Sequence, residues 1–242
     1  MADELGEDQA TGEIAEIYNE VKQLWAVPYV SSIHRFLATQ PGLLEWAWEA
    51  VAPVFRNGVA QEAGWRAADG LDLPSLSQIS PEALAAWQID DGSLAAIRDL
   101  SAGFVRVAPV NMVFAGLTRR LLDGDTPTAG ANVQIDWQPP RSLQQPPDMV
   151  AMPNSDAVLQ RLLEQFGTDM DGETFVPGLY RMLANWPGFL AHLTITLRPH
   201  FDERRVQDAY DALRSRIDVA VDEVFAQLPA VDARHARPSD EG

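Results

Sequence analysis

The chain has 242 residues, of which 46% are hydrophobic, enough to fill a sizeable core and to exclude disorder as its main state. It carries 18 basic and 35 acidic residues, so its formal net charge is −17, which disfavours nucleic acid and anionic membranes as partners. The absence of cysteine excludes disulfides, thiolate metal sites and a cysteine nucleophile.

Two further features concern the environment of the protein. No continuous apolar run of about 18 residues occurs, and the N-terminal segment is acidic and polar where a signal peptide is basic and then apolar. We therefore expect a cytoplasmic protein. Lys22 is the only lysine among the 18 basic residues. This bias fits either a surface adapted to concentrated salt or a GC-rich genome, and the sequence leaves both explanations open.

Helical periodicity dominates the first half of the chain. Thr11 is a plausible N-cap, and apolar residues recur at steps of three and four from Ile14 to Trp25, before Pro28. Further helices are expected in chain order over Val30 to Ala38, after the Pro41-Gly42 turn, from the cap Ser80-Pro81-Glu82, from Leu94 to Phe104 before a break at Pro109, and from Val113 to Leu121 before Gly124.

Composition changes between Asp123 and Pro153, where six prolines interrupt the chain and no apolar period persists. Helical pattern resumes after a cap at Ser155 or Asp156, stops at Gly167 and is clearest between Val206 and Leu228. The tail from Asp232 is polar. The predicted organisation is a first helical repeat over 1–122, a Pro-rich linker over 123–154 and a second repeat with a polar tail over 155–242.

The repeat itself is visible in the sequence. Val30–Phe55 aligns without a gap on Val176–Phe201 when the numbering is shifted by 146, and nine positions are identical. The shared L-A-x-x-P-G motif is typical of a helix end, a tight turn and a new helix start. We therefore predict an all-α fold in which two tandem helical repeats pack as a pseudo-dimer, with the ligand cleft at the seam between them.

The second repeat is predicted to be incomplete. Helices of the first copy at about 93 to 122 would have counterparts at 239 to 268, beyond the last residue of the chain. The surface that such helices would cover must then be capped by the linker, by the tail or by another subunit. A homodimer is therefore one expected partner arrangement.

These segments resemble the group I 2-haloacid dehalogenases. The matching pieces are VPYVSSIHRFLATQPG, AWEAVAP, DDGSLAAIR with the later Pro109, and above all LANWP at Leu183 to Pro187. The chain looks like a divergent, C-terminally shortened member. The resemblance implies an all-α, cofactor-free enzyme of two tandem repeats, in which an Asp general base activates water that displaces halide from the α-carbon of a 2-haloalkanoate with inversion.

The family's polar positions are replaced in this chain. The S-D-F triplet that carries the base falls on Gly178-Leu179-Tyr180, so the base position holds Leu179, which can neither take a proton nor orient water. Of the remaining positions that the resemblance implies, an Asn falls on Ala108, a Thr and a Glu fall on Asn57 and Gln61, and the Trp and Phe of the substrate pocket fall on Tyr29 and Ser32.

Other candidates do not replace the base. His34 is one helical step from Ile33, the repeat-mate of Leu179, so it should point to a different face. His192 and His200 are too far apart for joint ligation, and the expected role of every histidine is that of a surface or half-buried polar residue. The acidic stretch from Asp169 to Glu173 fails the register of a calcium loop and is better explained as a helix-entry loop, so no metal site is predicted.

Two hypotheses remain. The first is a non-catalytic protein that binds a small carboxylate-bearing molecule. The second is an active hydrolase that releases halide from 2-haloalkanoic acids with a rearranged base. Tyr29, Tyr180 and Asn185 adjoin the repeat seam and have groups able to orient a carboxylate, although helix capping or a buried hydrogen bond explains them equally well. The pocket candidates are therefore Tyr29, Ser32, Asn57, Gln61, Ala108, Gly178, Leu179, Tyr180 and Asn185.

Overall fold

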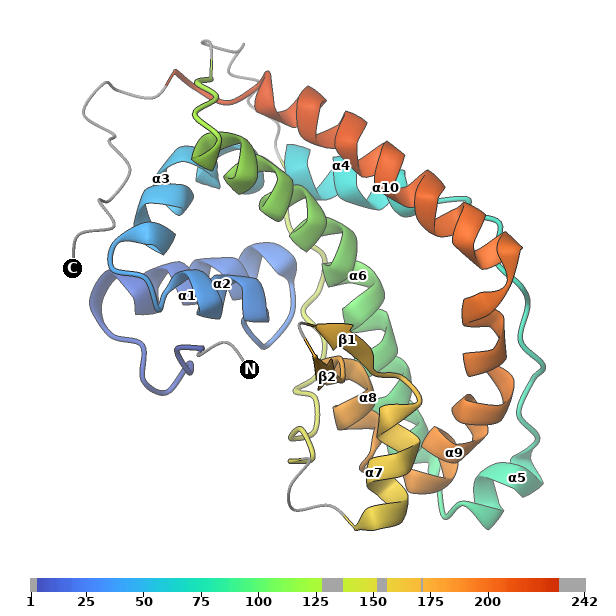
Figure 1. The fold of residues 1–242 in the computed structure, drawn as a ribbon. Coiled ribbons are helices and arrows are strands. Elements are labelled where there is room, and N and C mark those ends of the chain that lie inside the picture. Colours follow the sequence, from blue (N-terminus) through green and yellow to red (C-terminus); the bar gives the residue numbers. More distant parts are fainter. Residues whose placement is uncertain (1–3, 128–136, 152–155, 171, 231–242) are drawn as a thin grey trace. The chain divides into compact units, whose positions relative to one another are not determined.

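The computed structural model describes residues 4–127, 137–151, 156–170 and 172–230 (Figure 1). The protein is 63% helix and 2% strand, which confirms the predicted all-α class. The elements of the described part are, in chain order, α1 (Gly12–Trp25), α2 (Ser32–Leu37), α3 (Leu43–Arg56), α4 (Val59–Ala68), α5 (Pro81–Ala86), α6 (Asp91–Leu122), α7 (Ala157–Glu164), β1 (Thr168–Met170), β2 (Glu173–Phe175), α8 (Gly178–Leu183), α9 (Pro187–Thr196), the 3-10 helix η2 (Arg198–Asp202) and α10 (Arg204–Phe225).

The chain divides into two compact units, and neither is continuous in the sequence. The N-terminal unit contains Ala2–Gly70, Val105–Leu143 and Leu213–Gly242, whereas the central unit contains Leu71–Phe104 and Gln144–Ala212. Helices α6 and α10 therefore each contribute residues to both units. The compact units do not follow the predicted division at 123–154, because each unit takes residues from both sides of the linker.

The core of the N-terminal unit is built on α1 and α3. Thr11 is the N-cap of α1 as predicted, and Ala26 ends the helix in the left-handed conformation at φ 53°. The apolar stripe of α1 is buried and packs with α3 and the second half of α6, where the Trp25 indole Nε1 donates to Asn111 Oδ1 at 2.8 Å. The main buried side chains of this core are Tyr18, Val21, Trp25, Leu44, Val51, Phe55, Val113, Phe114 and Leu117.

Helix α4 was not predicted, because its buried face consists of small residues that give a weak apolar signal. Ala60, Ala63 and Ala67 recur at helical spacing and are all buried. Such a face allows close packing against a neighbouring helix. A Cβ on Gly64 would lie only 3.0 Å from the carbonyl oxygen of Pro109 in α6, so the two backbones are nearly in contact there.

The predicted helix break at Pro109 is wrong, because α6 continues through this proline. Proline removes one helical hydrogen bond and crowds the preceding turn. The neighbouring carbonyl of Arg106 accepts a bond from the Trp65 indole Nε1 at 2.9 Å, so α4 satisfies a backbone group beside the defect. Helix α6 is long and apolar enough to span a membrane by length and composition. Several of its apolar side chains, among them Ile97, Leu100, Val113 and Phe114, are buried in the cores of the two units, whereas Val105 is 75% exposed.

The central unit has its own core, which gathers side chains from α5 to α9 and the first part of α6. Ser80 caps α5 through a bond from Ala83 N at 3.2 Å, and Asp156 caps α7 through bonds from Val158 N and Leu159 N at 2.8 and 2.9 Å. Both caps were predicted. The buried members of this core are Ile89, Ile97, Leu100, Leu163, Phe166, Val176, Met182, Leu183, Ala184 and Leu190.

A small hairpin replaces the predicted helix-entry loop at 169–173. Strands β1 and β2 are antiparallel, with Thr168 opposite Phe175 and Asp169 opposite Thr174. Gly172 has φ 84°, and its N–H donates to Asp169 Oδ1 at 2.9 Å. Asp169 and Glu173 therefore belong to the strands of a hairpin. The Asp-Gly pair at 171–172 was the sequence signal for a two-residue hairpin loop, although Asp171 itself lies outside the described residues.

Helices α2 and α8 begin and end at positions that differ by 146, the offset of the sequence repeat. Both end in a right-handed cap residue, Ala38 in one and Ala184 in the other. The turns that follow differ, because Gly42 is the left-handed N-cap of α3 whereas Pro187 is already the first residue of α9. Several predicted features lie outside the described residues: linker residues 128–136 and 152–154, the alternative cap Ser155, and the polar tail with His235.

Candidate functional site

The predicted pocket residues are divided between the two units. Tyr29, Ser32, Asn57, Gln61 and Ala108 belong to the N-terminal unit. The remaining four belong to the central unit, at or just after α8, and these are Gly178, Leu179, Tyr180 and Asn185.

Tyr29 lies in the short segment between α1 and α2. Its side chain is half-buried, and burial raises the pKa of the phenol to about 12, although the positive charge of Arg106 acts in the opposite direction. Ser32 begins α2 and is exposed, and its hydroxyl accepts a long bond from Arg35 Nη2 at 3.4 Å. Tyr29 therefore faces a cation of its own unit, whereas Ser32 faces solvent.

Asn57 and Gln61 have structural roles at the junction of α3 and α4. Asn57 ends α3, and its Oδ1 accepts from Val59 N at 3.1 Å. Gln61 is fully buried, and its Nε2 donates to Phe55 O at 2.9 Å and to Leu24 O at 3.3 Å. Asn57 and Gln61 therefore stabilise the backbone at the junction of α3 and α4. Ala108 is exposed on α6 and offers no polar group.

Arg106 is a residue that the sequence interpretation missed. Its Nη1 donates to Ala26 O at 2.8 Å and to Arg141 O at 2.9 Å, so one guanidinium edge joins the end of α1 to the linker. Leu143 N also donates to Ala26 O, at 3.4 Å. No sequence pattern predicts this cluster, because the acceptors of Arg106 are backbone carbonyls from two segments that are distant in the sequence.

The position matched to the family's base lies in α8 of the central unit. Leu179 is half-buried and packs against the apolar core of that unit. Tyr180 stacks on Phe166 with ring centroids 4.1 Å apart and an interplanar angle of 11°, and burial raises the pKa of its hydroxyl. A Cβ on Gly178 would meet Met149 Sδ at 3.3 Å. The triplet therefore has no carboxylate, and its surroundings are mostly apolar.

Asn185, in the LANWP motif, anchors the end of the linker. Its Nδ2 donates to Met182 O at 2.8 Å and to Asp148 O at 2.9 Å. Arg181 and Val150 exchange two further bonds, from Val150 N to Arg181 O at 3.1 Å and from Arg181 Nε to Val150 O at 3.2 Å. Asn185 is exposed, and the structure shows its amide nitrogen bonded to two backbone carbonyls.

The histidines differ in burial. The prediction of a surface or half-buried residue is wrong for His34, which is fully buried among aromatic rings of the N-terminal unit. His192 and His200 are half-buried, as expected. His192 packs against Trp87 with ring centroids 5.0 Å apart, and His200 Nδ1 lies 2.8 Å from Glu203 Oε1. None of these three rings contacts a predicted pocket residue through a described hydrogen bond.

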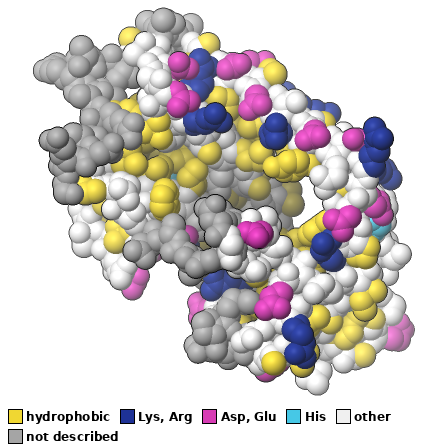
Figure 2. Space-filling model, viewed as in Figure 1, with side chains coloured by type: hydrophobic (Ala, Val, Ile, Leu, Met, Phe, Trp, Pro, Cys, Tyr) yellow, Lys and Arg dark blue, Asp and Glu magenta, His cyan; other side chains and the backbone are white. Residues whose placement is uncertain are grey.

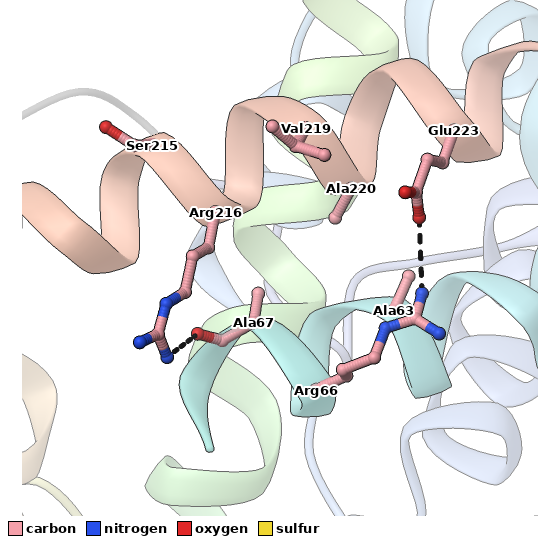
Figure 3. Close-up of a pocket in the computed structure, with 8 residues that line it drawn as sticks. All are labelled: Ala63, Arg66, Ala67, Ser215, Arg216, Val219, Ala220 and Glu223. Carbon is pink, nitrogen blue, oxygen red and sulfur yellow. Dashed lines mark hydrogen bonds and ion pairs between the residues drawn. The ribbon is translucent and has the colours of Figure 1, made fainter. Parts of the chain in front are cut away.

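A groove of about 400 Å³ lies between α4 and α10 in the N-terminal unit (Figure 3). Arg66 Nη2 lies 3.3 Å from Glu223 Oε2, and Arg216 Nη1 donates to Asp69 O at 2.7 Å. The groove contains none of the predicted pocket residues, and its ion pair is well exposed to water, so it offers no enclosed site for chemistry. Its lining residues are Ala63, Arg66, Ala67, Ser215, Arg216, Val219, Ala220 and Glu223.

The chain is similar in sequence to a curated dehalogenase. It is 25% identical over 201 residues to the configuration-inverting 2-haloacid dehalogenase of Alcaligenes xylosoxydans xylosoxydans. That alignment covers 79% of the chain and 66% of the relative, so the chain spans just under two thirds of the relative's length. The predicted resemblance is confirmed, and the chain is a divergent relative of the 2-haloacid dehalogenases. No family model matches it.

Solved structures agree with this fold. A D-2-haloacid dehalogenase mutant in complex with D-2-CPA has a TM-score of 0.75 at 21% identity, over 99% of this chain and 85% of that chain. A D-2-haloacid dehalogenase with L-LA has a TM-score of 0.72 at 20% identity, over 95% of this chain and 81% of that chain. At this level of identity the likeness establishes the fold.

Proposed function

We propose that this protein is a 2-haloacid dehalogenase-like protein that binds a small carboxylate-bearing molecule and does not hydrolyse it by the family's usual route. The observation that carries the proposal is Leu179 at the matched base position, packed against the apolar core of the central unit. A positioned general base supplies about 10²- to 10⁴-fold in rate, and an aliphatic side chain supplies none of it.

Signs of a duplication in the scaffold support this proposal. Helices α2 and α8 have the same length and the same offset as the sequence repeat, and their units have separate cores. A duplication that keeps its helices while replacing its polar positions retains binding surfaces more readily than a reaction, because fold and chemistry depend on different residues. We propose that the two copies still form the pseudo-dimer predicted from the sequence.

An active hydrolase is the second candidate. The observation that favours it is the sequence relative, which is named a configuration-inverting 2-haloacid dehalogenase. In this candidate a carboxylate from another part of the chain activates the water, and the protein still releases halide from 2-haloalkanoic acids without a cofactor. The two candidates differ in one measurable product, free halide.

The base position can be tested by putting the carboxylate back. We expect no chloride release from D- or L-2-chloropropionate by the wild-type protein, and measurable release by Leu179→Asp, because the new carboxylate would occupy the matched position of the water-activating base. Leu179→Asn is the matched control, since it has the same shape but cannot accept the proton. Circular dichroism checks that all three proteins are folded.

Chloride release by the wild-type protein at the rate of Leu179→Asp would contradict the proposal and favour the hydrolase. Equal inactivity of Leu179→Asp and Leu179→Asn would contradict the placement of Leu179 at the base position.

A further inference from the structure

Arg106 has no carboxylate partner among the described residues, a property that it shares in the N-terminal unit with Arg141, Arg214 and Arg216. Arg35, Arg56 and Arg120 each form an ion pair with Glu4, Glu20 and Asp222, respectively. In a chain with 35 acidic and 18 basic residues, an arginine that no carboxylate neutralises keeps a local positive charge.

The guanidinium of Arg106 is also held in a fixed position. Its Nη1 donates to the carbonyls of Ala26 and Arg141, and its own carbonyl accepts from the Trp65 indole Nε1. These bonds use one nitrogen, so Nε and Nη2 have no described partner and keep their donors for an incoming group. A preordered arginine binds a carboxylate well, because the planar fork of donors matches two carboxylate oxygens and little side-chain entropy remains to be lost.

The surroundings of Arg106 match a ligand that carries both charge and apolar surface. The positive charge acts on the Tyr29 phenol. The charge of Arg106 therefore acts on one residue that the resemblance places in the substrate pocket.

We infer that Arg106 binds the carboxylate of the small-molecule ligand, with the Tyr29 ring beside it. This inference rests on the proposed function, because it assumes that the protein binds such a molecule. It assigns the recognition of the negative charge to a residue that neither the sequence relative nor the repeat identifies.

The test compares affinities for propionate and for its neutral analogue propionamide by isothermal titration calorimetry. Arg106→Gln should weaken propionate binding by about 10-fold or more, the size typical of a lost charge-assisted hydrogen bond, and leave propionamide binding unchanged. Arg106→Lys keeps the charge but loses the planar set of donors. Its affinity for propionate should therefore lie between those of the wild type and Arg106→Gln. Raising the salt concentration should weaken propionate binding to the wild type more than to Arg106→Gln.

Arg216→Gln is the matched control, because Arg216 is also held by backbone carbonyls in the same unit and has no described ion pair. It should bind propionate like the wild type. Equal propionate affinity in the wild type and Arg106→Gln would overturn the inference while leaving the proposed function standing. Failure of the folded wild type to bind propionate, 2-chloropropionate or propionamide would instead overturn the proposed function. If Arg106→Gln does not fold, the comparison of Arg106→Lys with the wild type decides.

Discussion

At the residue scale, His34 is a fully buried histidine in the aromatic core of the N-terminal unit. Its ring stacks on Phe114 with centroids 4.3 Å apart and meets the Trp25 ring edge-on at 5.3 Å. Neither ring nitrogen has a described hydrogen-bond partner of good geometry. An unpaired polar group in such a core is destabilising when it is charged and tolerable only when it is neutral.

The pH dependence of stability should therefore carry the signature of His34. Burial lowers the pKa of the imidazole from 6.5 to about 3. Between these values the unfolded chain binds a proton at this site and the native protein does not, so the free energy of unfolding should fall as the pH decreases from about 6.5. One proton corresponds to about 1.4 kcal/mol per pH unit. Urea denaturation at a series of pH values measures it.

His34→Leu is the comparison for this prediction, because it fills the same apolar site without a titrating group. Its stability should depend less steeply on pH than that of the wild type in the range below 6.5, whereas carboxylate contributions remain in both proteins. Parallel curves for the two proteins would show that His34 is not a buried neutral ring.

Residues of the site divide into those that the sequence reveals and those that it does not. The substitution at Leu179 could be predicted, because the triplet before LANWP shows it directly in the sequence. Gln61 and Asn185 could not be assigned, since their partners are backbone carbonyls such as Leu24 O and Asp148 O. Arg106 was missed for the same reason, because only folding brings its acceptors together.

At the scale of elements, helix α4 packs closely against α6 at Pro109. The approach depends on Gly64, because a Cβ there would lie 3.0 and 3.1 Å from the carbonyl oxygen and carbon of Pro109. Both neighbours are backbone atoms, so neither can move aside as a flexible side chain could. The indole of Trp65 can then reach the carbonyl of Arg106.

Gly64→Ala should destabilise the protein by about 1–3 kcal/mol, because the added methyl group forces the two helices apart. The matched control is Gly92→Ala in the exposed start of α6, where the nearest atom to the new Cβ is Asp90 Oδ1 at 3.6 Å. This control should be neutral or stabilising by about 0.5–1 kcal/mol, since alanine favours a helix. Thermal or urea unfolding measures both, and equal effects would contradict the close contact.

Helix ends were predictable where a side chain or a glycine marks them. Thr11, Ser80 and Asp156 all stand at the positions expected of caps, and α10 follows the apolar steps from Val206. The missed elements have weaker signals: α4 has an alanine face, and the hairpin at 168–175 has three-residue strands and is marked only by its Asp-Gly pair. Tertiary packing decides both, so local pattern was insufficient.

At the scale of the whole molecule, the dominant physical quantity is the net charge of −17. Acidic side chains are interspersed with arginines on the side of α10 that Figure 2 shows, and several ion pairs of this helix are largely exposed. Exposed pairs contribute little to stability, so the excess of carboxylates should leave a net repulsion in the folded state.

Added KCl should therefore raise the free energy of unfolding, because it screens this repulsion. The rise should be steepest below about 0.5 M, where the Debye length shortens from about 10 Å toward its molar value of about 3 Å. Urea denaturation from low to multimolar KCl measures it. A stability independent of KCl would indicate that the arginine bias reflects genome composition rather than adaptation to salt.

The all-α class could be predicted from helical periodicity. The discontinuity of the two compact units in the sequence could not be predicted, because it depends on α6 and α10, each of which contributes residues to both units. A linear division at the Pro-rich linker is the simplest expectation from composition. The composition does not show that α6 continues through Pro109 and contributes to both units. The two units could therefore not be predicted from the sequence.

The central claim is that the dehalogenase-type scaffold has kept a site for a small carboxylate while its water-activating position became aliphatic. One experiment tests it most directly: stoichiometric wild-type protein is mixed with 2-chloropropionate, and bound ligand and free chloride are measured in the same sample. The proposed function predicts saturable binding, with the ligand recovered intact. Chloride released in proportion to the protein, with 2-hydroxypropionate as the second product, would contradict it.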